Sequence, residues 1–162
     1  MSHTLPTFIS ALGWQDPQRA QAFDRWLAAA STAQGLNPAT VRLASADASF
    51  RRYFRIDSTR GSRVIMDAPP DKEDCKPFVK VAGLMAQAGL NAPQVLAWDE
   101  GQGFMLLSDL GQRTLMQCLD EGAGAANLPR FKQALDVLLP WQQASRAGVL
   151  PAYDEAVLRR EL

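Results

Sequence analysis

Hydrophobic and polar residues alternate in several short stretches between residues 36 and 111, as in β-strands that bury one face. Residues 43–56 (LASADASFRRYFRI) have β-forming residues at both ends and a small, polar centre, which predicts a strand, a tight turn and a returning strand. A short apolar run at 64–66, ended by the prolines at 69–70, predicts a third strand, and residues 104–108 predict another. This part of the chain is therefore expected to form a sheet of about five antiparallel strands.

Apolar residues recur at spacings of three and four elsewhere in the chain, as in amphipathic helices. Residues 16–34 predict a helix that Asp16 caps and that Pro17 begins. Residues 77–89 predict a helix across the sheet, with Gly89 as its stop. Helical patterns return near the end of the chain, at 114–119, 128–143 and 153–162, with the Gly/Ala-rich connector 121–127 between the first two. The predicted class is α+β, with a loose segment at 1–15, a helix and sheet at 16–111, and a helical part at 112–162.

Composition excludes several other classes of protein. The 162 residues are 47% hydrophobic and 21% charged, enough for one core or for a small lobe with part of another. Seventeen basic and seventeen acidic residues balance, so no overall basic field favours a nucleic-acid partner. No apolar run reaches the roughly 20 residues of a membrane span. Cys75 and Cys118 lack a metal-ligand spacing and His3 is the only histidine, which argues against a zinc site or a serine–histidine triad.

The turn in 43–56 is the first candidate for a binding site. Its small residues expose backbone N–H groups, and three arginines (Arg51, Arg52 and Arg55) follow at once. Backbone N–H groups beside guanidinium groups suit an anion, most plausibly a nucleotide phosphate. The alternative from the residues alone is an ordinary hairpin with a solvated basic strand.

The order of strand, turn, strand, strand, helix, strand, strand is that of a protein-kinase-like small lobe. The chain resembles the amino-terminal part of aminoglycoside-phosphotransferase-type kinases, and within them the bacterial kinases that phosphorylate the anomeric carbon of N-acetylmuramate and N-acetylglucosamine. The resemblance is carried by SADASFRRYFRI (45–56), VIMDAPP (64–70), EDCKPFV (73–79), AGLNAPQVLAWD (88–99), GFMLLSDLG (103–111) and YDEAVLRREL (153–162).

This resemblance implies that the chain binds ATP and a small sugar. It places four residues in the turn over the phosphates, namely Asp47, Ala48, Ser49 and Phe50. There the backbone N–H groups of Ala48 and Ser49, and the Ser49 hydroxyl, would donate hydrogen bonds to phosphate. The alternative is that Ser49 only closes the turn and contacts no ligand. The adenine would be held by backbone groups of Ser108, Asp109 and Leu110, with Met66 or Leu107 packed on the ring. Asp109 has an alternative role as a turn or cap residue.

The third strand departs from the kinase pattern, because it lacks the lysine that kinases use to pair the phosphates. Strand alternation puts Arg52 on the face of Phe54, which makes it the favoured replacement, with Asp67 or a phosphate as its partner. Asp67 itself is interpreted first as an ion-pair partner of an arginine and second as part of a substrate or metal site. Arg51 and Arg55 are interpreted as solvated, and Lys80 as a further candidate or a surface residue.

The sequence contains no H-x-D-x-x-x-x-N motif and no metal-binding aspartate after one, so catalytic and Mg²⁺ ligands are expected beyond residue 162. The chain is thus interpreted as the first half of a kinase, inactive by itself, whose partners are ATP, the sugar and the missing carboxy-terminal half. The resemblance implies a cytoplasmic enzyme of cell-wall recycling. The alternatives are a kinase for an aminoglycoside or another small alcohol, and a non-catalytic anion- or nucleotide-binding module.

Overall fold

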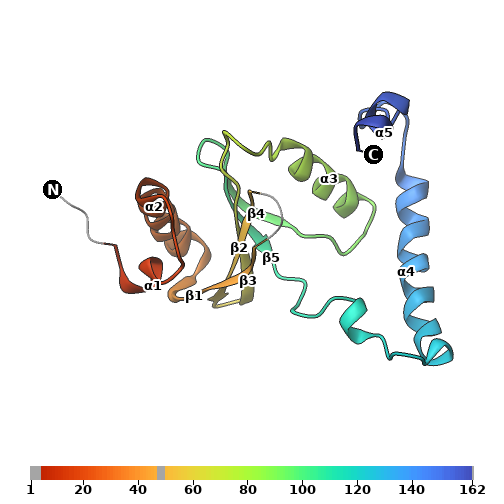
Figure 1. Ribbon diagram of the computed structural model, residues 1–162, viewed down its shortest axis with the longest axis horizontal. Coiled ribbons are helices and arrows are strands. Elements are labelled where there is room, and N and C mark those ends of the chain that lie inside the picture. The colour runs from red at the N-terminus through yellow and green to blue at the C-terminus, as the bar shows by residue number, and fades with distance from the viewer. Residues whose placement is uncertain (1–4, 47–49, 162) are drawn as a thin grey trace. The chain divides into compact units, whose positions relative to one another are not determined.

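The computed structural model describes residues 5–46 and 50–161. From residue 17 onward, its elements follow the order that the sequence predicts (Figure 1). The described elements are α1 (Thr7–Ser10), α2 (Pro17–Gln34), β1 (Leu36–Ala46), β2 (Arg52–Ser58), β3 (Gly61–Asp67), α3 (Lys76–Gln87), β4 (Val95–Asp99), β5 (Phe104–Ser108), the 3₁₀ turn Met116–Cys118, α4 (Gly124–Ala144) and α5 (Glu155–Glu161).

The strands form one five-stranded sheet in the order β1-β2-β3-β5-β4, and each neighbouring pair is antiparallel. In the β2–β3 hairpin, Arg52 lies opposite Asp67 and Ser58 lies opposite Gly61. The sheet and its helices confirm the predicted α+β class and match a kinase-like small lobe.

Helices cover both faces of this sheet, with α2 and α3 on opposite sides (Figure 1). The first face, which we call the α1–α2 face, buries Phe54, Ile56 and Ile65 against Phe23 and Leu27 of α2. The second, which we call the α3 face, buries a smaller set against the segment that enters α3, namely Met66, Ala68, Cys75, Met105 and Leu107. Because side chains alternate along a strand, neighbouring residues of β2 and β3 belong to different faces.

Local sequence signals explain how α2 begins and ends. The Asp16 carboxylate accepts a hydrogen bond from the Gln18 backbone N–H at 2.8 Å, and Pro17 occupies the first turn. Gly35 ends the helix with φ +64°, a left-handed conformation that glycine adopts without steric cost. The cap and the first turn of this helix were both predicted.

The segment before α2 is more ordered than the sequence predicts. A loose segment was expected over 1–15, but residues 7–10 form α1, Ile9 is fully buried and Leu12 is nearly so. Both side chains join the core of the α1–α2 face. Burial of these two apolar residues holds the segment in place, although α1 is too short to give a periodic signal.

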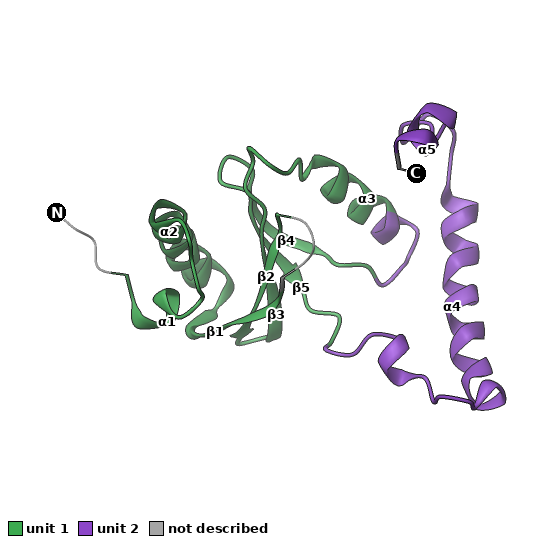
Figure 2. Cartoon of the chain, in the orientation of Figure 1, with its two compact units in different colours: residues 1–84, 92–111 green, residues 85–91, 112–162 purple. Residues whose placement is uncertain are grey.

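The chain divides into two compact units, residues 1–84 with 92–111, and residues 85–91 with 112–162 (Figure 2). In the second unit α4 begins at Gly124, within the connector predicted at 121–127. Asn127 explains this early start, because its side chain bonds both the backbone N–H and the C=O of Asp120 and so ties down the preceding turn. Six large apolar side chains of α4 are exposed, namely Leu128, Phe131, Leu135, Val137, Leu138 and Leu139. No helix within the described parts is long and apolar enough to cross a membrane.

Candidate functional site

The register of the sheet places the predicted ligand-binding residues at its two ends. Asp67 lies opposite both Arg52 on β2 and Phe104 on β5, at the end where the connection from β1 enters β2. Ser108 lies opposite Arg63 at the other end, where β5 leaves the sheet. A ligand that used both groups of residues would therefore lie along β3.

At the first end, Asp47, Ala48 and Ser49 lie outside the described residues, and their predicted contacts stay predictions. Phe50 follows them with its side chain 64% exposed. The Lys72 ammonium lies 5.9 Å from the centre of the Phe50 ring. Phe50 thus offers an open aromatic surface beside a cation.

Met66 lies on the α3 face, where its side chain is fully buried, and Leu107 is 4% exposed. Neither residue presents a free surface to a flat ring. Tyr53, the cross-strand neighbour of Met66, and Val64 are only half-buried on the same face. These two side chains are better placed than Met66 to contact a ligand.

Arg52 points to the opposite face of the sheet. It donates from Nη2 to the Leu12 carbonyl at 2.5 Å, and its guanidinium lies 4.3 Å from the ring centre of Trp14. Burial lowers the pKa of Arg52, and the nearby charge of Asp67 opposes that effect. The structure therefore separates Arg52 from Met66 and from the α3 face, while it agrees with the predicted alternation along β2.

Asp67 forms an ion pair with Arg19 of α2. The carboxylate is almost fully buried and accepts from Arg19 Nη2 at 2.6 Å and from Nε at 3.0 Å. Arg19 also donates to the Gln102 carbonyl, and its guanidinium lies 4.0 Å from the ring centre of Phe104. Burial raises the pKa of Asp67, and the hydrogen bond and charge of Arg19 pull it down in part. The interpretation of Asp67 as an ion-pair partner agrees with this geometry, with Arg19 as a partner that the sequence did not indicate.

At the second end, a network of hydrogen bonds fixes the chain as it leaves β5. The Asp109 carboxylate accepts from Arg55 Nε at 2.8 Å and Nη2 at 3.2 Å, from the Ser62 hydroxyl at 2.8 Å and from the Gly111 backbone N–H at 2.9 Å. The Arg55 hydrogen bond is the main cause that lowers the pKa of Asp109 to about 2. Arg55 is thus held by a carboxylate, whereas the sequence predicted a solvated side chain. The Asp109 side chain is occupied by protein donors, while Ser108 is half-buried and Leu110 is exposed.

Arg51 lies on the α3 face, as its alternation with Arg52 requires. It donates from Nε to Glu73 Oε2 at 3.1 Å, and its Nη2 lies 3.0 Å from the same oxygen. Burial lowers the pKa of Arg51, but hydrogen bonds with Glu73 and Tyr53 outweigh that effect and leave it raised. Arg51 was predicted to be solvated, and no local spacing in the sequence indicates this pair because Glu73 lies 22 residues away in an irregular segment.

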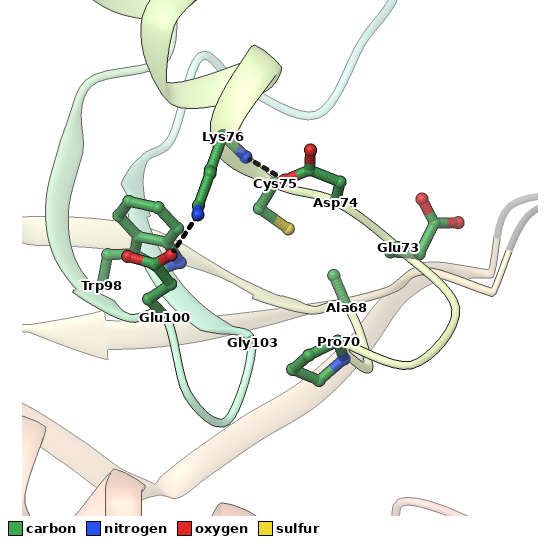
Figure 3. Close-up of a pocket in the computed structure, with 9 residues that line it drawn as sticks. All are labelled: Ala68, Pro70, Glu73, Asp74, Cys75, Lys76, Trp98, Glu100 and Gly103. Atoms are coloured by element: carbon green, nitrogen blue, oxygen red, sulfur yellow. Dashed lines mark hydrogen bonds and ion pairs between the residues drawn. The ribbon is translucent and has the colours of Figure 1, made fainter.

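A pocket of about 240 Å³ opens beside Glu73, between the β3–α3 connection and the β4–β5 turn (Figure 3). Gly103 closes one wall at φ +70°, and a Cβ added there would meet the Ala68 carbonyl oxygen at 1.9 Å, so glycine is required. Figure 3 shows the Lys76 ammonium bonded to Glu100, with the Cys75 thiol nearby. Burial raises the pKa of that thiol. With three carboxylates and one lysine among its lining residues, this pocket does not suit a polyphosphate.

No group of three or more His, Cys, Asp or Glu side chains within 5–46 and 50–161 is arranged to hold a metal ion. The lobe thus has an α3 face with a cation near the β1–β2 connection and a fixed backbone after β5. The five-stranded antiparallel sheet and α3, which packs on one of its faces, together define a kinase-like small lobe.

The chain belongs to the phosphotransferase enzyme family, whose pattern matches residues 40–162. This finding confirms the family predicted from the sequence. Residues 5–39, with α1 and α2, precede the matched region.

Similar proteins carry the name N-acetylmuramate/N-acetylglucosamine kinase. The chain is 58% identical over 125 residues to such a protein from Pseudomonas aeruginosa, an alignment that covers 77% of the chain and 36% of that protein. The values for Pseudomonas putida are 45% identity over 123 residues, 76% of the chain and 35% of the relative. The relative from Neisseria meningitidis is 44% identical over 124 residues, which cover 75% of the chain and 36% of that relative. The chain therefore spans little more than a third of the length of the curated relatives it matches.

Proposed function

We propose that the chain is the nucleotide-binding small lobe, with the first part of the large lobe, of an ATP-dependent phosphotransferase that acts on the anomeric hydroxyl of an N-acetylated amino sugar. The observation that carries this proposal is the five-stranded sheet of a member of the phosphotransferase enzyme family, in which Arg55 holds Asp109 directly after β5. The sugar class follows from the name of relatives that are 44–58% identical to the chain.

In this proposal ATP lies along β3 on the α3 face. The adenine is held by backbone groups of 108–110 and contacts Tyr53 and Val64, which are half-buried there. The phosphates lie at the other end, near the β1–β2 connection with Ala48 and Ser49. Bound ATP supplies the phosphoryl group, and the chain's own residues position it.

We expect the Mg²⁺ ligands, like the catalytic residues, to lie beyond residue 162, as the family resemblance implies; within residues 5–46 and 50–161 no cluster of three or more potential ligands occurs. The 162 residues also lack an H-x-D-x-x-x-x-N motif. We therefore expect the chain alone to bind nucleotide without transferring phosphate. We place the complete enzyme in the cytoplasm, where it would return cell-wall amino sugars to metabolism.

Calorimetric titration of the chain with Mg-ATP and with adenosine tests the nucleotide site. We expect both to bind in the micromolar to millimolar range, with ATP the tighter ligand because of its phosphates. If neither ligand binds, the proposal that this chain contains a nucleotide-binding lobe is contradicted.

The substrate is tested with a protein extended to the length of its relatives. We expect ATP-dependent phosphorylation of N-acetylmuramate or N-acetylglucosamine, followed as phosphate transfer to the sugar. Phosphorylation of an aminoglycoside but of neither sugar would overturn the proposed substrate class and leave the phosphotransferase proposal in place.

A further inference from the structure

The α3 face carries the guanidinium of Arg51 at the end of the sheet where, in kinases, the third-strand lysine pairs with the nucleotide phosphates. That strand reads Val64, Ile65 and Met66, and Met66 is fully buried. Arg51 stands directly before β2 on the same face, beside Tyr53. A cation is therefore present on the correct face, although it comes from a different strand.

Glu73 holds this guanidinium in place. Both Nε and Nη2 of Arg51 lie within 3.1 Å of Glu73 Oε2, and the two side chains are 30% and 13% exposed. Glu73 belongs to the β3–α3 connection, so the pair ties the start of β2 to the segment that enters α3. A guanidinium carries five N–H donors in a planar fork, so one arginine can serve a carboxylate and a phosphate together.

Three other cations are worse placed. Arg52 faces the α1–α2 side, where the Leu12 carbonyl and the Trp14 ring surround it. Arg55 is bound by Asp109 and the Gly111 carbonyl at the far end of the sheet. The Lys76 ammonium pairs with Glu100 over the acidic pocket.

We propose that Arg51 binds the nucleotide phosphates in place of the third-strand lysine, and that Glu73 positions Arg51 as a helix glutamate positions that lysine in other kinases. This inference rests on the proposed function, which brings the phosphates to the β1–β2 connection. It assigns the role to Arg51 rather than to the adjacent Arg52, which the sequence favoured.

The test compares Mg-ATP with adenosine on the wild-type chain and on Arg51→Ala. We expect Arg51→Ala to weaken ATP binding roughly 10- to 100-fold, the range for loss of a charge-assisted hydrogen bond. Adenosine lacks phosphates, so its affinity should change less than twofold. Arg51→Lys keeps the charge but loses the fork, and should recover part of the ATP affinity.

Arg42→Ala is the matched control. Arg42 is an exposed arginine of β1 that lies opposite Arg55 and pairs with Asp57, so the variant removes one positive charge near the other end of β2 from Arg51. We expect ATP affinity within about twofold of wild type, because exposed charges at a distance are screened by salt. Circular dichroism on each variant checks that the fold is kept.

The outcomes separate the inference from the proposed function. If wild type binds neither ligand, the proposed nucleotide site itself fails. If wild type binds ATP and Arg51→Ala binds it equally well, the site stands and the role of Arg51 is overturned. A specific phosphate contact is also contradicted if Arg51→Ala loses as much affinity for adenosine as for ATP. The same holds if Arg42→Ala loses as much ATP affinity as Arg51→Ala.

Discussion

The two faces of the sheet are packed to different degrees. On the α1–α2 face, Phe23 lies at the centre of an aromatic cluster with Trp14, Phe54 and Phe104, with ring centroids 5.0–5.5 Å apart from it. On the α3 face the fully buried set is smaller, and half-buried residues such as Phe78 surround it. The first face holds most of the buried apolar residues of this unit, whereas side chains of the proposed nucleotide site on the second face, such as Tyr53 and Val64, are only half-buried.

The charged groups follow the same division. Asp67 and Arg19 are sealed at the edge of the aromatic cluster, where burial raises the pKa of Asp67. Asp109 and Arg55, on the α3 face, form a richly hydrogen-bonded pair that lowers the pKa of Asp109. The carboxylate pKa is thus raised on one face, where desolvation dominates, and lowered on the other, where the hydrogen bond with Arg55 dominates.

Truncation of one aromatic ring on each face should give the largest difference. Phe23→Ala leaves a cavity at a fully buried position, and we expect a loss of about 3–5 kcal/mol in the free energy of unfolding. Phe78→Ala removes a half-buried ring and should cost roughly 1–2 kcal/mol. Urea denaturation followed by circular dichroism measures both. Equal losses would contradict the difference in packing between the faces.

Removal of the buried charge on the α1–α2 face should have the next largest effect. Asp67→Asn leaves Arg19 without its anionic partner, and we expect a loss of about 3 kcal/mol. Asp57→Asn breaks the exposed pair with Arg42 and serves as the control, with an expected loss under about 1 kcal/mol. The same denaturation experiment measures them. A negligible cost for Asp67→Asn would show that the pair adds nothing to the stability of this face.

The sequence predicted the sheet, α2 and α3 because their periodicities are long enough to read. It also placed Phe54 on a buried face and Arg52 beside it, since alternation along β2 determines both. It could not predict which element covers that face. Residues 5–15 lack a helical period, so the burial of Ile9 and Leu12, and with it the enclosure of Arg52, emerged only from the structure.

The candidate site shows the same limit. The Arg51–Glu73 and Arg55–Asp109 pairs join residues 22 and 54 positions apart. Neither pair lies on one helix or one hairpin, so no local spacing signals it. The segments that carry them were recognised as important from the resemblance, but the partners of each charge depend on how β2, β3 and the connections after β3 and β5 meet in space.

The smallest expected effect concerns acid stability on the α3 face. The folded-state pKa of Asp109 is about 2, below its ordinary value of 3.8, so its contribution to stability is present above pH 4 and is lost as the pH falls towards 2. Asp109→Asn should therefore cost about 1 kcal/mol at pH 7 and nothing near pH 2. Urea denaturation of wild type and variant at pH 7, 4 and 2.5 measures this difference.

The comparison must be between variant and wild type at each pH, because Asp67 titrates with the opposite sign. Burial raises the folded-state pKa of Asp67, so its titration favours the folded chain as the pH falls and partly hides the loss at Asp109 in wild type alone. Ser62→Ala is the control, since it removes a neutral donor to Asp109 and keeps the Arg55 pair. It should cost less than Asp109→Asn at pH 7. The difference in free energy of unfolding between Asp109→Asn and wild type could instead stay constant from pH 7 to 2.5. That result would show that the charge of the Asp109 carboxylate does not stabilise the segment after β5, and that the Arg55–Asp109 network contributes only through uncharged hydrogen bonds and packing.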